Sequence, residues 1–66
     1  MQGIGKLLYV KTVAGILCCT CEHVYRLIRD GKLDAIRLGS RRIRVYEGSV
    51  VRFVDQAKIQ MQDYDL

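Results

Sequence analysis

The 66-residue sequence contains no proline, no glycine- and serine-rich linker and no internal repeat, so nothing in it divides the chain. We expect one domain over residues 1–66, with flexible ends at residues 1–7 and 62–66. A chain of this length buries only about 60% of the surface that its unfolded form exposes, so its core must be small. A deep cleft with buried catalytic groups needs a larger scaffold, and we therefore expect no enzyme.

Long apolar runs and a leader pattern are also missing. No stretch reaches the about 18 apolar residues that suggest a membrane span, and residues 1–10 lack the length and cleavage pattern of a signal peptide. We therefore expect a cytoplasmic protein without a membrane partner. Cys18, Cys19 and Cys21 stand too close together for the spaced disulfide framework of a secreted domain, which predicts reduced thiols.

These cysteines and His23 are zinc-ligand types, but their spacing argues against a metal site. Cys21 and His23 are two positions apart on a predicted helix and point to different sides of it. We interpret Cys19 as a small buried residue, Cys21 as exposed and His23 as a packing residue. An exposed thiol at a helix N-terminus leaves redox sensitivity of binding open for Cys21. No nucleophile–base pair, carboxylate dyad or phosphate loop is visible, and no cofactor or small-molecule substrate is predicted.

The first half of the chain predicts two helices joined by a short turn. Val13, Ile16 and Leu17 have the spacing of one apolar helix face, although Tyr9 and Val10 offer no capping oxygen before it. After the turn formed by residues 18–20, a second helix is predicted around Glu22 to Asp30, with an apolar face of Val24, Leu27 and Ile28. Such a connection suits a helix-turn-helix, although any helical hairpin could use a similar one.

The ends of the second helix are well marked. Thr20 is a good N-cap, Glu22 suits the positive end of the helix dipole, and Gly31 can supply a left-handed stop. Because Glu22, Arg26 and Arg29 share the outward face, with Tyr25 at its edge, this face is polar and able to donate hydrogen bonds.

After Gly31 the pattern changes to the alternation of β-strands. Ile36 and Leu38 alternate with Arg37, and a second run of residues 42–46 sets Ile43 and Val45 against Arg42, Arg44 and Tyr46. Residues 39–41 have the composition of a hairpin loop. Four of the arginines that contribute to the net charge of +4 fall in this stretch, namely Arg37, Arg41, Arg42 and Arg44. The cluster suits either a solvated surface or a nucleic-acid contact.

A third amphipathic helix is predicted to cover this hairpin, with an apolar face of Val50, Phe53, Val54, Ala57 and Met61. The acidic end, with Asp63 and Asp65, is expected to fray. The whole pattern predicts a small α+β winged helix-turn-helix in the order helix, helix, strand, strand, helix.

Residues 20–45, TCEHVYRLIRDGKLDAIRLGSRRIRV, preceded by LLYVKTVAGIL and followed by EGSVVRFV, resemble the excisionase family of phage and mobile-element DNA-binding proteins. The resemblance spans about four fifths of the chain, and its most specific part is VYRLIRDGKLDAIRLG followed by an arginine pair. A related half-domain occurs in mercury-resistance-type regulators. The resemblance implies a wing that approaches a minor groove, a task that falls to Arg41 and Arg42, with Arg44 in support.

The chain departs from the family pattern at three places. Tyr9 and Thr12 replace the threonine cap and following glutamate of the first helix, and Cys18 stands where the turn usually has a left-handed glycine. Asp34 stands where the family often has proline, and we expect the absence of this proline to loosen the entry to the wing.

For the major groove we expect Arg26 to read a base, with Glu22 orienting it and Cys21 lying near the DNA. Thr20, Tyr25 and Arg29 are expected to contact phosphates. Arg37 and Arg44 are interpreted as a cross-strand pair of solvated wing residues.

The resemblance implies a recombination directionality factor that binds and bends double-stranded DNA beside an attachment site and helps an integrase to excise the element. The expected partners are DNA, the integrase and further copies of the chain. A transcriptional regulator with the same fold and a protein-interaction module with a basic wing remain as alternatives.

Overall fold

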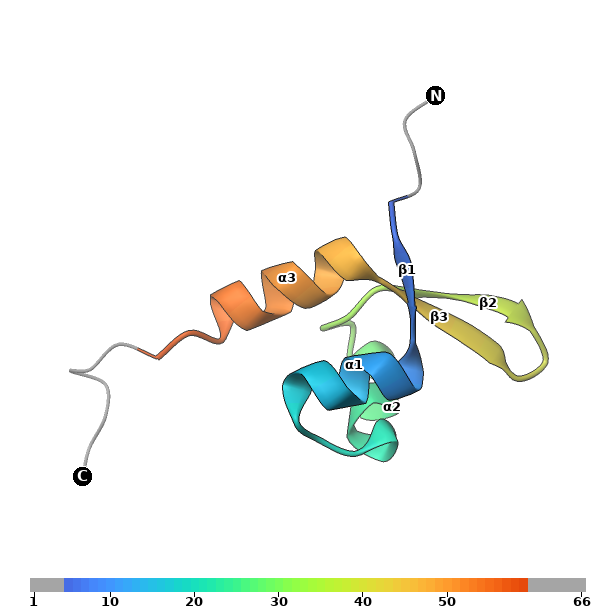
Figure 1. The fold of residues 1–66 in the computed structure, drawn as a ribbon, viewed down its shortest axis with the longest axis horizontal. Coiled ribbons are helices and arrows are strands. Elements are labelled where there is room, and N and C mark those ends of the chain that lie inside the picture. Colours follow the sequence, from blue (N-terminus) through green and yellow to red (C-terminus); the bar gives the residue numbers. More distant parts are fainter. Residues whose placement is uncertain (1–4, 60–66) are drawn as a thin grey trace.

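A computed structural model of the chain describes residues 5–59, which form an α+β fold of three helices and one three-stranded antiparallel sheet (Figure 1). In chain order the elements are β1 Leu7–Tyr9, α1 Val10–Leu17, α2 Cys21–Arg29, β2 Ala35–Gly39, β3 Arg42–Tyr46 and α3 Glu47–Gln56. The predicted order of helix, helix, strand, strand and helix is confirmed, and the arrangement is compatible with a winged helix-turn-helix. No helix within the described residues is long and apolar enough to cross a membrane.

Strand β1 is an addition to the predicted fold. The sheet has the order β1-β3-β2, so β3 is its central strand and the expected two-stranded wing has a third strand beside it. Leu7, Leu8 and Tyr9 pair with Tyr46, Val45 and Arg44. Leu7 therefore belongs to the sheet, although it was expected in a flexible end. Met61 and residues 62–66, expected to close the third helix and to fray, lie outside the described residues.

The core lies between the sheet and helices α1 and α2. Its buried apolar side chains come from strands β1 and β3, from the three helices and from the segment after α2. They are Leu8, Val10, Val13, Ala14, Val24, Leu27, Leu33, Val45 and Val50. Fully burying a side chain of this size contributes about 1.5–3 kcal/mol. Val13 and Val24 are fully buried, so the pairing of α1 with α2 lies at the centre of the core.

The apolar face of α1 is displaced from its predicted position. Val13 is buried and Leu17 is half-buried as expected, but Ile16 is 54% exposed, and Val10 and Ala14 occupy the buried face instead. As predicted, no side chain caps the start of α1 at Tyr9. The helix therefore depends on packing against β1 and α2 for its stability.

The ends of α2 agree with the sequence prediction. The Thr20 Oγ1 accepts a hydrogen bond from the His23 backbone N–H at 3.1 Å, and Gly31 has a φ of +78°. Val24 and Leu27 are buried and Ile28 packs partly against the core. His23, in contrast, is exposed, so its interpretation as a packing residue was wrong.

The strand faces differ from the predicted alternation. Residues opposite each other in antiparallel strands share a face, and Val45 lies opposite both Leu8 and Ala35, which makes a row toward the core. Ile36 lies opposite Arg44 on the outer face, whereas Arg37 lies opposite Ile43, so the expected pair of Arg37 with Arg44 is wrong. The register shifts between Arg37 and Gly39, and the intervening Leu38 is exposed. Such a bulge re-aims a side chain that alternation alone places elsewhere.

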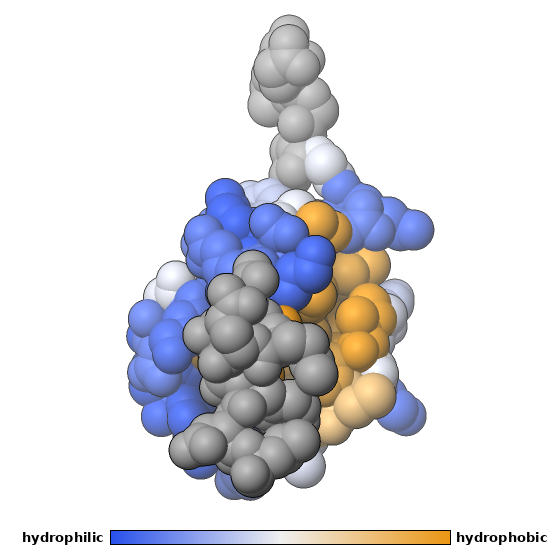
Figure 2. All heavy atoms as spheres, turned by 90° about the vertical axis from the view of Figure 1, so that its left-hand side faces the viewer, coloured by the Kyte–Doolittle hydropathy of each residue, from blue (hydrophilic) through white to orange (hydrophobic). Residues whose placement is uncertain are grey.

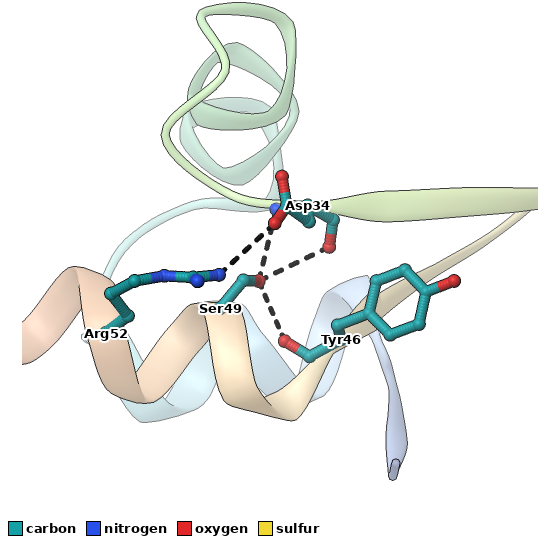
Figure 3. Close-up of polar contacts among 4 residues, drawn as sticks. All are labelled: Asp34, Tyr46, Ser49 and Arg52. Atoms are coloured by element: carbon teal, nitrogen blue, oxygen red, sulfur yellow. Dashed lines mark hydrogen bonds and ion pairs between the residues drawn. The ribbon is translucent and has the colours of Figure 1, made fainter. Parts of the chain in front are cut away.

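Ser49 joins α3 to the entry of the wing (Figure 3). It is the only buried polar residue within residues 5–59, and its Oγ accepts a hydrogen bond from the Asp34 backbone N–H at 3.1 Å. The Ser49 Oγ lies 2.8 Å from the Tyr46 carbonyl oxygen and 3.3 Å from that of Asp34. Since a hydroxyl has one hydrogen, the shorter contact is the better candidate for its donated bond.

Asp34 is held by its side chain as well. The Arg52 guanidinium lies 3.2 Å from the Asp34 carboxylate, and both side chains are largely exposed (Figure 3). An ion pair of this kind contributes about 0–1 kcal/mol. The wing entry is therefore anchored to α3 rather than loosened, and the hydrogen bond from the Asp34 N–H is one that a proline could not donate.

The turn between α1 and α2 contains a strained residue, which predicts a stabilising substitution. Cys18 has φ 55° and ψ 45°, in the left-handed region, as the absent glycine suggested. Left-handed geometry costs an ordinary L-residue about 1–2 kcal/mol, and glycine avoids this but is more flexible when unfolded. Cys18→Gly should therefore raise the free energy of unfolding by about 0.5–1 kcal/mol in urea titrations. Cys18→Ala, which keeps the strain, should not, and equal stability of the two variants would contradict the assignment.

The Ser49 contacts predict a destabilising substitution. Ser49→Ala removes the partly buried hydrogen bond that the Asp34 N–H donates to the Ser49 Oγ, which should lower the free energy of unfolding by about 0.5–1.5 kcal/mol. The midpoint of urea unfolding, followed by circular dichroism, measures this loss. Ser40→Ala in the exposed wing turn is the control and should stay within about 0.5 kcal/mol of the parent. A similar small change at Ser49 would mean that these contacts contribute little.

Candidate nucleic-acid interface

Helix α2 presents a polar outer face. Its buried side, formed by Val24 and Leu27, fixes the rotation of the helix, and Glu22, Arg26 and Arg29 are exposed as predicted. Cys21 at the first helical position is exposed too, and Tyr25 is 41% exposed. This face combines guanidinium donors with a carboxylate acceptor, which is the side-chain chemistry that reads base edges and phosphates.

The capped start of α2 adds donors to this face. The Thr20 Oγ1 uses one lone pair to accept from the His23 N–H, and its own O–H is still able to donate. The first N–H groups of the helix also carry partial positive charge. Thr20 therefore has the chemistry expected of a phosphate contact without losing its structural role.

The tip of the β2–β3 hairpin carries the second part of the basic surface. Gly39 pairs with Arg42, so the turn comprises Ser40 and Arg41, one residue shorter than the loop expected from composition. Arg41 and Arg42 are exposed there. The Arg37 guanidinium donates to the Ser40 carbonyl oxygen at 3.3 Å and so contacts the turn itself.

Arg44 lies further back, on the outer face of the sheet. Its guanidinium carbon lies 4.3 Å from the centroid of the Tyr9 ring, and its Nη1 donates to the Ile43 carbonyl oxygen at 3.0 Å. The side chain is half-buried. Sequence reasoning missed this cation–π contact because it did not detect β1, which brings Tyr9 opposite Arg44. Arg44 is thus held against β1, whereas Arg41 and Arg42 project from the tip.

The hairpin and α3 extend from the body of the molecule in opposite directions (Figure 1). Helix α2 packs against α1 in the body between them. The residues predicted for the major groove therefore lie on the body and those predicted for the wing lie on the projecting hairpin, while α3 is remote from the hairpin tip.

The cysteine cluster does not assemble into a ligand set. Cys18 and Cys21 are exposed free thiols and Cys19 is half-buried against the core, close to its predicted role. Among residues 5–59, no group of three or more histidine, cysteine or acidic side chains is placed to hold a metal ion.

The contact between Tyr9 and Arg44 predicts a measurable coupling. A cation over an aromatic ring contributes about 0.5–1 kcal/mol at an exposed site. In a double-mutant cycle with Tyr9→Leu and Arg44→Met, the unfolding free energies should reveal a coupling of this size. Because the Tyr9 side chain makes no capping bond, the leucine variant leaves the start of α1 otherwise intact. Additive effects of the two substitutions would exclude the contact in solution.

Comparisons with known proteins identify no relative of the chain. No protein-family model matches the chain, and no curated protein matches it significantly. The resemblance to the excisionase family therefore depends on the residues quoted above, of which residues 24–39 are the most specific. What this surface binds has to be inferred from its geometry and chemistry.

Proposed function

We propose that this chain is a small sequence-specific DNA-binding protein that inserts α2 into a major groove and lays its wing over the adjacent backbone or minor groove. The observation that carries the proposal is the exposed polar face of α2, formed by Glu22, Arg26 and Arg29, on a helix capped at Thr20 and preceded by a three-residue turn. This is the geometry that a helix-turn-helix uses to read bases.

Within α2, Arg26 is the residue proposed to read sequence. An arginine can donate to both N7 and O6 of guanine, which gives a bidentate contact. Glu22 precedes it by four residues and can orient its guanidinium or accept from a cytosine amino group. Arg29, Tyr25 and the Thr20 hydroxyl are proposed to contact phosphates, which adds affinity without base selection, and Cys21 lies beside them.

The wing is proposed to recognise the shape of the minor groove. Guanidinium groups at Arg41 and Arg42 would meet the enhanced negative potential of a narrow minor groove and so respond to groove width more than to base identity. Arg44 is proposed to stabilise the position of the wing rather than to contact DNA first, since its guanidinium stacks on the Tyr9 ring of β1.

The role in excision rests on the sequence resemblance. We propose a recombination directionality factor that is cytoplasmic and associated with the nucleoid, that bends DNA beside an attachment site and that acts with an integrase. One monomer offers one helix and one wing, a small footprint, so useful specificity requires several copies on the DNA. A transcriptional regulator would use the same residues on a single site over a promoter.

Substitutions at the interface test DNA binding. A preferred site is first selected from random duplex DNA, and binding to it is then measured by fluorescence anisotropy across a salt series. Arg26→Ala should weaken binding by about 1–3 kcal/mol, roughly 5- to 150-fold, and relax the preference at one base pair. Arg41→Ala or Arg42→Ala should weaken binding to all sequences and lower the salt slope by about one each.

Lys58→Ala is the control. It removes an exposed positive charge just after α3, outside the proposed interface, and should leave DNA affinity unchanged. If the triple variant at Arg26, Arg41 and Arg42 binds DNA as well as the parent, the proposed interface is excluded. If the selection enriches no DNA sequence at all, the protein-interaction alternative takes its place.

The selected sites also separate the two DNA-binding roles. Regularly spaced copies that are bound cooperatively, together with stimulation of excision by an integrase in vitro, would support the directionality factor. A single isolated motif that overlaps a promoter would support the regulator.

A further inference from the structure

Helix α3 has two apolar faces and packs only one of them against the core. Val50 is buried and Phe53 is half-buried, whereas Val51 and Val54 are 64% and 49% exposed. Ile16 of α1, which is 54% exposed, borders the same region. Figure 2 shows apolar side chains gathered along one side of the molecule. Single exposed apolar residues are ordinary, but a contiguous group of them marks an interaction surface.

These side chains line a groove between α1 and α3. The apolar residues of its lining come from β1, α1 and α3 and are Leu8, Ile16, Val50, Val51 and Val54. The groove lies away from the hairpin tip, since the hairpin and α3 extend in opposite directions (Figure 1). An occupant of the groove would therefore leave the hairpin tip accessible.

The charged residues that line the groove are both acidic, although the chain as a whole carries a net charge of +4. They are Glu47, the first residue of α3, and Asp55, one residue before its end. Glu47, Val51 and Asp55 follow one another at intervals of four residues and form one row along the helix, so the Cα atoms of the two acidic residues lie about 12 Å apart. Among residues 5–59 neither carboxylate has an ion-pair partner, so both can meet a basic group of another molecule.

We infer that this groove binds an amphipathic helix of another protein, whose apolar face has a lysine or arginine at each end. Two residues that are seven or eight positions apart in a helix are separated by about 10–12 Å, which matches the distance between Glu47 and Asp55. Apolar side chains between these two basic residues would pack on Ile16, Val51 and Val54. This is the helix-in-groove mode of recognition, in which apolar anchors supply the affinity and the end charges fix the register.

The charges argue against two occupants that the chain itself could supply. Two copies that paired their α3 helices would set carboxylate against carboxylate in either orientation, Glu47 against Asp55 when antiparallel and Glu47 against Glu47 when parallel. Such a juxtaposition of like charges is repulsive. Residues 60–66 contain Asp63 and Asp65 and no lysine or arginine, so they lack the basic groups that the groove requires. The basic helix therefore has to come from a different protein.

The small size of the groove sets the strength of the contact. Stable interfaces bury about 1,200–2,000 Å² in total, and a helix of two or three turns on this groove reaches at most the lower end of that range. We therefore expect a dissociation constant on the order of 10–100 μM. The contact involves neither α2 nor the wing and does not rest on the proposed function.

Selection of peptides on the full chain, without DNA, tests the inference. A displayed library of random peptides of about 14 residues, or about four helical turns, is selected on the immobilised protein. The enriched peptides should carry apolar residues at helical spacing between two basic residues. When such a peptide is added as a synthetic probe, the NMR methyl signals of Ile16, Val51 and Val54 should shift while the amides of α2 do not.

Three results would overturn the inference. They are the absence of any enriched peptide, the enrichment of acidic peptides, and peptide-induced shifts that fall on another surface. Shifts of the same methyl signals with protein concentration in the absence of peptide would assign the groove to a second copy instead.

Substitutions in the groove test its apolar lining. Val54→Ser should abolish binding of an enriched basic peptide, measured by fluorescence anisotropy. Gln56→Ser, on the same helix but outside the groove lining, should leave the peptide affinity unchanged. Circular dichroism verifies that each variant is folded. Equal affinities of the two variants would place the peptide elsewhere on the molecule.

Charge reversal tests the role of the two carboxylates. Glu47→Lys and Asp55→Lys should each weaken peptide binding roughly 2- to 5-fold, and the double variant should prefer the same peptide with glutamates in place of its basic residues. Asp55 lies in the last turn of α3, where a positive charge is favourable, so its replacement does not weaken the helix. Asp30→Lys makes the same change at the exposed end of α2 and should have no effect at about 0.15 M salt. An unchanged preference of the double variant would exclude the charge selection.

Discussion

The burial of Val45 at the centre of the sheet is the interaction on which the other elements depend. This residue is fully buried and lies between Leu8 on β1 and Ala35 on β2, so one side chain fixes both strand registers. The same face packs against the helix-turn-helix, and α3 begins directly after β3. In a chain with so small a core, a one-residue slip at Val45 would turn Arg44 toward the core and expose Val45. Register and helix packing are therefore specified together.

This arrangement explains how a chain with few local stabilising features, such as helix caps, positions the basic surfaces of α2 and of the hairpin. Helix α1 has no capping side chain and is followed by a strained residue at Cys18, so it is stabilised mainly by what it packs against. Helix α2 is well capped and can leave its polar face free. Arg44 on Tyr9 and Ser49 beneath Asp34 tie the hairpin to β1 and α3. The elements that we propose to meet DNA are thus supported by contacts on their other sides.

Much of this could be predicted from the sequence, and the failures have physical reasons. The order of helices and hairpin, the Thr20 cap and the left-handed position at Cys18 follow from local chemistry and spacing. Strand β1 could not be found because three residues are too few to display a period. The bulge at Leu38 defeats alternation, and the second apolar face of α3 looked like part of the core because periodicity does not show which valine meets a neighbour. Arg26 and Arg41 were identifiable as exposed because charged side chains without partners remain in water.

The bond between the Asp34 N–H and the Ser49 hydroxyl has a consequence for how such chains diverge. A proline at position 34 lacks this N–H and fixes its own backbone angle, so it would rigidify the wing entry without help from α3. A serine at position 49 would then have less to satisfy, and an alanine there would be tolerated. The two positions are therefore coupled across fifteen residues. Changing both, from Asp34 with Ser49 to proline with alanine, should cost less stability than the sum of the two single changes.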